Sequence, residues 1–412
     1  MMNFLQKLKD EVAFIKGNYL ILVVTWLLMD FFREIPASFY GLYVIELGGT
    51  ALIIGMIGFA SKICYASVQF PGGYIADKYG RRLLLISTPF VKGFIYLLFA
   101  FAPNWKLILV GEMLYGIFRI SNPSLHALTA ESIPPEKRGV GYSIYQLTID
   151  VTSTPAPLLA GLLFYKFGFV LGMRIAYVFV SIAYILTSII RFKLKETIES
   201  AEEINIKEII MAFPISIKES INVLFKVPKS LLYFIVSRNV FTLAASMFFP
   251  YIIIYVTEEI GLSKFQWSII MSMQFLITTI LIIPFGKMID KYGRKRLILI
   301  FNILLSFILI SITYGNFYVL LLVMPLLGIS FSVSGSASKS LVADLTPKKV
   351  RGRILGLIRF IGLIIGATGN LLGGFIYQTM PHKNIFLIPI FLITSGIIVF
   401  FLFVNEPEIK EI

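Results

Sequence analysis

The sequence predicts an all-α polytopic membrane protein, with 12 transmembrane helices divided between two matching six-helix halves. Of its 412 residues, 57% are hydrophobic and 15% are charged, and the mean hydropathy is +0.85. Soluble domains carry a charged fraction of about a quarter, so this composition excludes an ordinary soluble domain. The second observation is a charged motif that occurs twice, about half a chain length apart, as an internal duplication produces.

Apolar runs of roughly 20 residues, enough to cross a bilayer, alternate with short charged or Gly/Pro-containing turns. In the first half these runs lie at 19–46, 50–76, 83–102, 106–130, 140–166 and 172–191. In the second half they lie at 229–257, 265–288, 296–315, 317–343, 353–379 and 384–404. We therefore expect three parts: a six-helix bundle at 1–191, a linker with an amphipathic segment at 192–228, and a second bundle at 229–412.

The repeated motif is a charged turn that follows an apolar run. It reads GYIADKYGRR from Gly73 to Arg82 and GKMIDKYGRKR from Gly286 to Arg296, so that Asp77 and Asp290 lie 213 residues apart. Within these turns Gly80 and Gly293 are free to adopt positive φ. A second loop pair, ESIPPEKRG and DLTPKKVRG, keeps the same spacing between four residues: Glu131 with Asp344, and Arg138 with Arg351.

The basic residues are unevenly distributed between the two faces of the predicted membrane protein. Most of the 37 lysine and arginine residues fall in the loops on the side of both termini, which the positive-inside rule assigns to the cytoplasm. We expect a multi-pass protein of the cell membrane with cytoplasmic termini. The net charge of +14 therefore reflects topology, and nucleic acid is not an expected partner.

With these motifs the chain resembles the major facilitator superfamily, most closely its 12-helix drug/proton antiporter branch. The resemblance is carried by Gly73, Asp77, Lys78, Gly80, Arg81 and Arg82, with a weaker copy at Gly286, Asp290, Gly293 and Arg294. It implies two six-helix bundles that are related by a pseudo-twofold axis along the membrane normal and that work by alternating access.

The resemblance also implies a role for the charged loops. Asp77 should lie against the start of the 353–379 span, near Arg351 and Arg353, and Asp290 should do the same near Arg138. Glu131 and Asp344 should lie beside Arg81 and Arg294. Such contacts would latch the cytoplasmic side in the outward-facing state. The alternative is that these loops only orient the protein during insertion.

Charged side chains inside the spans are the candidates for coupling transport to an ion, because they are costly in a bilayer. Asp30, Arg33 and Glu34 share one helical face, and we place the proton carrier on Asp30 or Glu34. A purely structural ion pair is the alternative, and the other candidates are Glu112, Arg119 and Asp150. The second half offers only Arg238, Lys339 and Arg359, so we expect it to shape an apolar binding surface.

Small residues mark the expected helix contacts. Gly362, Gly366, Gly369 and Gly373 lie on one face of the 353–379 span, which lets a neighbouring helix approach closely. The segment GISFSVSGSASKS of the 317–343 span is interpreted as close packing in the same way. The segment APLLAG resembles the Gly-Pro-x-x-Gly-Gly element of the family's antiporters, with Ala156 in place of its first glycine.

These features favour a secondary active transporter that exports small, partly hydrophobic organic molecules in exchange for protons. Uptake by a proton- or sodium-coupled symporter and facilitated diffusion stay open. A membrane enzyme is disfavoured, because the two histidines, His126 and His382, are predicted on opposite membrane faces, and a sensor is disfavoured, because the sequence shows no long soluble domain. No segment resembles a nucleotide-binding loop, so we expect a gradient rather than ATP to drive transport. We expect no cofactor or metal, a monomer in the lipid bilayer, and a small-molecule substrate that the sequence does not identify.

Overall fold

The structure, a computed structural model, describes residues 14–198, 205–224, 227–347 and 350–406. It is all-α in these ranges, which confirms the predicted fold class. Each expected span of the first half is helical: α2 (Gly17–Ala37) with α3 (Tyr40–Glu46), α4 (Ala51–Lys78), α5 (Arg82–Ala100), α6 (Trp105–Ile117) with α7 (Asn122–Ser132), α8 (Arg138–Ser153) with α9 (Ala156–Phe167), and α10 (Phe169–Arg191).

The second half repeats this plan after the linker helix α11 (Ile206–Leu224). Its helices are α12 (Lys229–Phe248) with α13 (Ile252–Glu258), α14 (Lys264–Tyr292), α15 (Arg294–Tyr314), α16 (Phe317–Leu345), α17 (Arg351–Thr379) and α18 (Asn384–Phe403). Short 3-10 turns join some of these helices: η1 (Phe118–Ser121), η2 (Pro135–Lys137) and η3 (Phe249–Tyr251).

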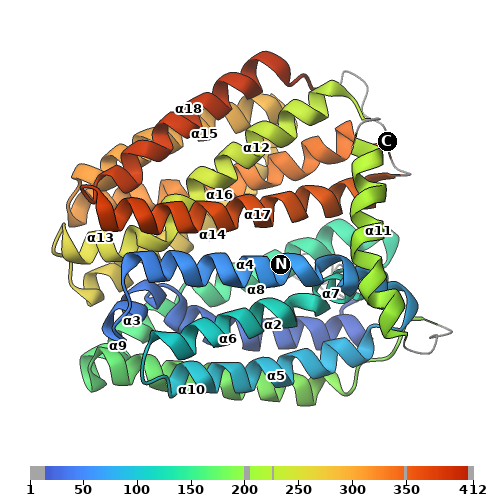
Figure 1. The fold of residues 1–412 in the computed structure, drawn as a ribbon, viewed down its shortest axis with the longest axis horizontal. Coiled ribbons are helices and arrows are strands. Elements are labelled where there is room, and N and C mark those ends of the chain that lie inside the picture. Colours follow the sequence, from blue (N-terminus) through green and yellow to red (C-terminus); the bar gives the residue numbers. More distant parts are fainter. Residues whose placement is uncertain (1–13, 199–204, 225–226, 348–349, 407–412) are drawn as a thin grey trace, which may run out of the picture.

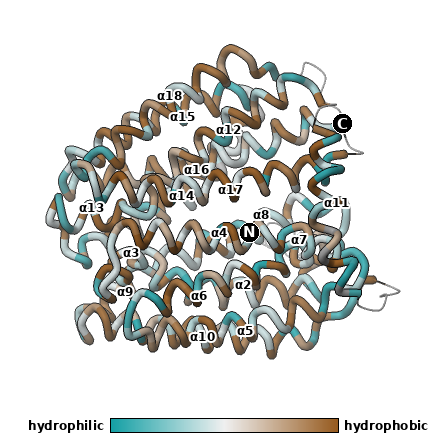
Figure 2. Tube along the Cα trace, viewed as in Figure 1, coloured by the Kyte–Doolittle hydropathy of each residue, from teal (hydrophilic) through white to brown (hydrophobic). Residues whose placement is uncertain are grey.

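Ten helices in the described residues are long and apolar enough to cross a membrane. Of the other two expected spans, α2–α3 carries four charged residues and a break, and α6–α7 is interrupted by η1. Figure 2 shows hydrophobic residues along the helices and hydrophilic residues gathered at the two ends of the molecule, mainly at the end that carries α11. This distribution is that of a multi-pass membrane protein.

The helices form two groups that lie one above the other in Figure 1, with α2–α10 below and α12–α18 above. The groups meet along two pairs of helices: α4 packs against α17, and α9 packs against α14. At one end of the molecule, α11 runs across both groups and packs against α4 and α17. We call this end, which also carries the turns at Gly80 and Gly293, the linker side.

The two halves are joined on the side opposite α11. One apolar core there draws residues from both halves, among them Tyr43, Ile57, Phe164, Tyr251 and Trp267. Toward the linker side, the buried residues separate into two cores, one at 19–194 in the first half and one at 231–404 in the second. The halves therefore share one apolar core at one end of the membrane span. Toward the linker side each half has its own core, and the halves meet along α4 and α17, where Gln69 donates to the backbone oxygen of Gly356 at 2.9 Å.

The first and seventh spans both break near this shared core. The break in the first span follows Pro36, and that in the seventh contains Pro250; proline lacks the N–H that would continue the helix. The two broken spans meet closely, since a Cβ on Gly41 would lie 3.1 Å from the backbone oxygen of Pro250. The breaks occur at equivalent places in the two halves.

The turns confirm the duplication that the sequence motifs predict. Gly80 and Gly293 have φ of +94° and +86°, and Gly48 and Gly261, which share the same spacing, have φ of +79° and +77°. Glycine adopts such values without the steric cost that a Cβ imposes. The four glycines therefore place equivalent left-handed turns in the two halves.

The predicted glycine face of α17 is confirmed. Gly362 faces Arg238 and Asn239 of α12, and Gly369 lies so close to α12 that an added Cβ would be 2.7 Å from the backbone oxygen of Leu243. The opposite seam of α17 holds α4, because a Cβ on Gly374 would lie 2.8 Å from the backbone oxygen of Ala51. Glycine therefore lets α17 pack closely against a helix of each half.

Replacing one of these glycines should destabilise the protein. A Cβ at Gly373 would overlap the backbone oxygen of Met247, so Gly373→Ala should cost about 1–3 kcal/mol through overpacking and lower the thermal unfolding midpoint in detergent. Gly352→Ala is the matched control in the same helix, with no atom within 4 Å of its Cβ; helix propensity should stabilise it by up to about 1 kcal/mol. Equal midpoints for the two variants would contradict the close contact.

Candidate functional site

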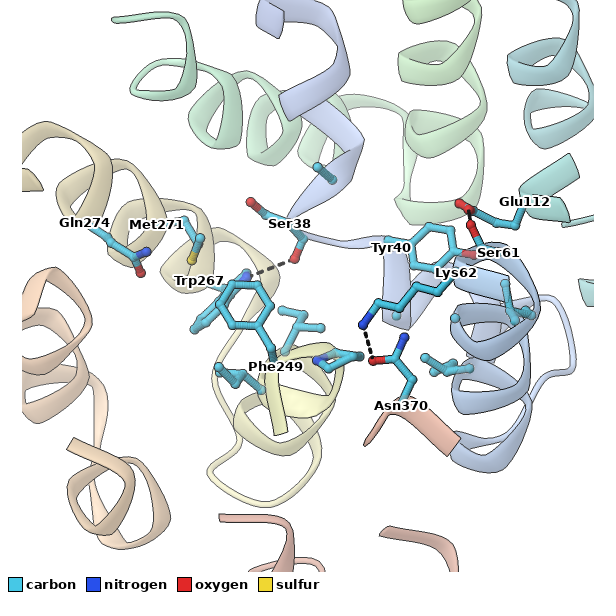
Figure 3. Close-up of a pocket in the computed structure, with 18 of the residues that line it drawn as sticks. Ser38, Tyr40, Ser61, Lys62, Glu112, Phe249, Trp267, Met271, Gln274 and Asn370 are labelled. Carbon is cyan, nitrogen blue, oxygen red and sulfur yellow. Dashed lines mark hydrogen bonds between the residues drawn. The ribbon is translucent and has the colours of Figure 1, made fainter. Parts of the chain in front are cut away.

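A cavity of about 340 Å³ lies between the halves, where the broken first and seventh spans meet (Figure 3). We call it the central cavity. Its polar wall comes mostly from the first half and includes Tyr40, Ser61, Lys62, Glu112 and Arg119. Its apolar wall comes from η3, α13 and α14 of the second half, with Phe249, Ile253, Trp267 and Met271. The cavity therefore presents charged groups of one half to apolar groups of the other.

Glu112 of α6 is the carboxylate of this cavity. It accepts a hydrogen bond of 3.0 Å from the Ser61 hydroxyl, and Figure 3 shows both side chains beside Tyr40. Among the described residues it has no ion-pair partner within 4.0 Å. Arg119, one to two turns further along, stacks its guanidinium on the ring of Tyr65, 4.2 Å from the ring centroid. A carboxylate without a fixed cation is free to change its charge.

Lys62 of α4 crosses from the first half to the second. Its Nζ donates to the Ser246 hydroxyl at 3.0 Å, to the backbone oxygen of Gly366 at 3.0 Å and to Asn370 Oδ1 at 3.2 Å. Figure 3 shows its side chain directed at Asn370. The sequence places Lys62 inside the second apolar run but gives no signal for these contacts. This contact between the halves requires a glycine at position 366, because a side chain there would occupy the space of the ammonium group.

The charges predicted on the first span form a separate cluster inside the first half. Arg33 Nη2 lies 3.1 Å from Asp30 Oδ1 and 3.2 Å from Glu34 Oε1, and Asp30 is only 6% exposed. The shared helical face is therefore as predicted, and its two carboxylates share the one guanidinium of Arg33. The last candidate, Asp150 of α8, accepts a hydrogen bond of 3.0 Å from Gln146, one turn away.

A larger cavity, of about 810 Å³, lies in the second half toward the linker side. We call it the basic cavity, because Arg238 of α12, Lys339 of α16 and Arg359 of α17 all line it. The surface expected to be apolar thus carries three cations beside its phenylalanines. The serines of α16 that the sequence assigned to packing also line this cavity, at Ser330, Ser334 and Ser338.

The first signature loop is fastened within its own half. Arg81 forms the expected ion pair with Glu131 and donates to the Thr197 hydroxyl at 3.1 Å. Glu196, just beyond α10, accepts the backbone N–H groups of Arg81 at 2.9 Å and Arg82 at 2.8 Å. A carboxylate at the start of α5 satisfies free N–H groups and complements the helix dipole.

The second loop repeats this arrangement. Arg294 lies 3.5 Å from both Asp344 and Glu406, and Glu406 accepts the backbone N–H groups of Arg294 and Lys295. Sequence reasoning predicted Asp344 but missed Glu196 and Glu406. Their only signal is an acidic residue shortly after the last span of each half. Arg351 donates to the backbone oxygens of Ala343 and Thr346.

The contacts expected between the halves at these loops are not formed in the described residues. Asp77 is exposed and makes no hydrogen bond or ion pair there, and Arg353 instead lies 3.3 Å from Glu219 of α11. These contacts are expected in the outward-facing state and stay a prediction for that state. Arg138, the expected partner of Asp290, is exposed at the start of α8. The side chain of Asp290 itself lies outside the described residues. The signature glycines Gly73 and Gly286 have open space at their Cβ positions.

The linker helix α11 connects the halves in place of those loops. Glu208 accepts hydrogen bonds from the Tyr74 hydroxyl at 2.5 Å and from Lys78 Nζ at 2.8 Å. These hydrogen bonds lower the pKa of the Glu208 carboxyl, and the one from Lys78 has the largest effect. Phe213 packs against Phe70 of α4 and Phe360 of α17. The predicted amphipathic segment therefore packs on protein, with one end on each half.

Known proteins resemble this chain along its whole length. The model of the Major Facilitator Superfamily matches residues 22–241 and 234–412. The multidrug resistance protein MdtG of Salmonella typhimurium is 22% identical over 395 residues, which cover 92% of this chain and 93% of the relative. A Na(+), Li(+), K(+)/H(+) antiporter of Planococcus maritimus is 28% identical over 169 residues, 39% of this chain and 38% of the relative.

Solved structures show the same fold. The nucleoside transporter NupG, in a mutant form, superposes with a TM-score of 0.72 at 14% sequence identity, covering 94% of this chain and 99% of that one. The family model extends over both halves, and the helices cross the membrane repeatedly. The chain therefore belongs to the Major Facilitator Superfamily, and it is a multi-pass membrane transporter rather than an enzyme.

Proposed function

We propose that this protein is a proton-coupled secondary transporter that exports small organic molecules from the cell by alternating access. Segments 1–191 and 229–412 act as the two moving units, in the cell membrane with both termini in the cytoplasm. One observation carries the proposal: the halves share an apolar core opposite α11 and have separate cores on the linker side. Such a molecule alternates by exchanging the end at which its halves meet.

The similar proteins support exchange and export as the direction. One relative is named for multidrug resistance, and another for the exchange of monovalent cations with protons. The positive side of the molecule is the linker side, which supports a cytoplasmic position for α11 and the termini. In this arrangement, the conformation described here faces the cytoplasm.

We place the coupling proton on Glu112. It lines the cavity between the halves and accepts a hydrogen bond from a neutral hydroxyl, whereas Asp30 and Glu34 both contact Arg33. Protonating Asp30 or Glu34 would break an ion pair that already exists in this conformation, whereas, among the described residues, protonating Glu112 would break none. Asp30 and Glu34 then hold the geometry of the first half, which was the structural alternative weighed for them.

We further propose that Asp77 acts in the opposite conformation. When the linker side closes, Arg353 leaves Glu219 and pairs with Asp77, so that the signature loop and the linker helix compete for one guanidinium. The support is that Asp77 is exposed here while Arg353 is held by α11 at 3.3 Å. An exchange of this kind biases the two states only by the difference in contact free energy.

The first functional prediction concerns Glu112→Gln. Because the amide keeps the size of the carboxyl but cannot take up a proton, the gradient-driven transport rate in proteoliposomes should fall to the rate measured without a gradient. Counterflow of solute should continue. The solute is chosen beforehand by thermal-shift screening of small aromatic molecules of each charge type. Glu136→Gln, at an exposed position of η2, is the control and should stay coupled.

If Glu112→Gln keeps its gradient dependence while Asp30→Asn or Glu34→Gln loses it, the proton carrier belongs to the cluster around Arg33.

The second functional prediction concerns the exchange of Arg353. In a Cys64→Ala background, a cysteine at Ser338 in the basic cavity reports access from the linker side to a membrane-impermeant maleimide. Asp77→Asn should raise its labelling rate and slow transport, because the closed state loses an ion pair. Glu219→Gln should lower the labelling rate, because the open state loses one. Asp290→Asn should have a smaller effect than Asp77→Asn.

Labelling rates that stay the same in the Asp77 and Glu219 variants would show that neither carboxylate sets the balance between the two states.

A further inference from the structure

The basic cavity gathers three cations and no carboxylate. Arg238, Lys339 and Arg359 reach it from three different helices, and its lining contains neither aspartate nor glutamate. In the part of the chain that the structure describes, none of the three forms an ion pair or a side-chain hydrogen bond. One nitrogen of Arg238, Nη1, is buried without a partner. The cavity thus holds a concentrated, uncompensated positive charge within a membrane-spanning bundle.

The cations inside the first half are treated differently. Arg33 contacts two carboxylates and Lys62 donates to three oxygens. Arg191 has one buried nitrogen, Nη2, without a partner, but its other nitrogens donate to the Thr25 hydroxyl and a backbone oxygen. Unpartnered charge within a membrane protein is costly, and side chains that carry it face a water-filled or ligand-binding cavity. The three cations of the second half therefore have the arrangement of a binding site rather than that of a structural network.

The three cations also act on one another. Arg238, Lys339 and Arg359 line the same cavity, so their like charges repel one another across it. A cavity lined by one sign of charge and bounded by apolar walls focuses its field on the enclosed space. A bound anion would remove this repulsion and would gain charge-assisted hydrogen bonds from both guanidinium groups.

The remaining lining adds neutral donors and an apolar wall. Ser330, Ser334 and Ser338 recur at every fourth residue of α16, so they share one face. Ser330 is only 3% exposed, and the hydroxyls of Ser330 and Ser334 are both buried without partners. Aromatic rings form the apolar part of the lining, and these belong to Tyr142, Phe234, Phe241, Phe331 and Phe400.

We propose that the basic cavity binds an amphipathic organic anion, with a carboxylate, sulfonate or phosphate head and an apolar body. Arg238, Lys339 and Arg359 hold the head, Ser330 and Ser334 donate to it, and the aromatic rings cover the body. The volume of about 810 Å³ is within the range of pockets that enclose small organic ligands. This proposal rests on the proposed transport function and names its substrate class.

Three probes that share one aromatic body test the charge preference: 1-naphthoate, the neutral 1-naphthamide and the cationic 1-naphthylmethylammonium. Their binding is measured by calorimetry on the full chain, purified in an uncharged detergent. We expect naphthoate to bind at least about ten-fold more tightly than the amide, since hydrogen bonds to charged groups discriminate by this amount or more. The ammonium should bind most weakly.

Variants of one cation then assign the preference to this cavity. Arg359→Gln should weaken naphthoate binding by about ten-fold and leave naphthamide binding unchanged. Arg359→Lys keeps the charge and should retain the preference for naphthoate, which also guards against a loss that comes only from misfolding. Lys106→Gln, at an exposed position on the opposite side of the molecule, is the control for net charge and should bind as the parent does.

An anionic lipid headgroup offers the same chemistry as a soluble anion, so retention of phosphatidylglycerol through purification is measured in parallel by mass spectrometry. Naphthoate or phosphatidylglycerol binding that depends on Arg359 supports the anion site and identifies its source. Equal affinities for the three probes together with Arg359-independent lipid retention overturn it. Because binding is measured without a gradient, a negative result here leaves the coupling experiments on Glu112 unaffected.

Discussion

The close packing of α17 against a helix of each half is the contact on which the rest of the structure depends. Its glycines bring the backbones of α12 and α4 within van der Waals distance on two different faces. Larger side chains there would separate the halves, and Lys62 would no longer reach Ser246, Gly366 and Asn370. A helix that belongs to one half yet packs tightly on the other couples their positions. Because this contact is narrow, it also allows one half to tilt against the other half.

The halves differ in how they treat charge, and the difference explains the division of labour that we propose. Cations of the first half are paired, stacked or hydrogen-bonded, so they stabilise one geometry. Arg238, Lys339 and Arg359 of the second half line a cavity instead, and among the described residues they form no ion pair. Between them lies Glu112, a carboxylate on the wall where the two halves meet. A change in the contact between the halves can therefore couple solute binding in the basic cavity to protonation of Glu112.

On the linker side, the two halves use the same set of contacts. In each half, one acidic residue beyond the last span holds the start of the third helix, and an arginine reaches back to the acidic end of the fourth span. These contacts make each signature loop rigid within its own half. Beyond the direct contact of α4 with α17, the halves are connected there by α11, whose Glu208 and Glu219 pair with opposite bundles. The linker is therefore part of the mechanism that we propose and not a passive tether.

The sequence by itself determined the helical spans, the duplication, the left-handed glycine turns at Gly80 and Gly293 and the glycine face of α17. Each of these depends on hydropathy or spacing along one stretch of chain, which are local properties. The pairs Arg81–Glu131 and Arg294–Asp344 were also predictable, because the family resemblance and the repeat spacing point to the same residues.

Only the tertiary structure decided which charges face a cavity. Asp30 and Glu112 look alike in the sequence, since each is a carboxylate in an apolar span. The rotation of each helix about its axis, set by all its neighbours together, keeps the face of Asp30, Arg33 and Glu34 inside the first half and turns Glu112 toward the space between the halves. The same reason hid the roles of Lys62, Glu196 and Glu406 and the convergence of Arg238, Lys339 and Arg359. Their partners lie on other helices, and no periodicity within one helix reports the orientation of the next.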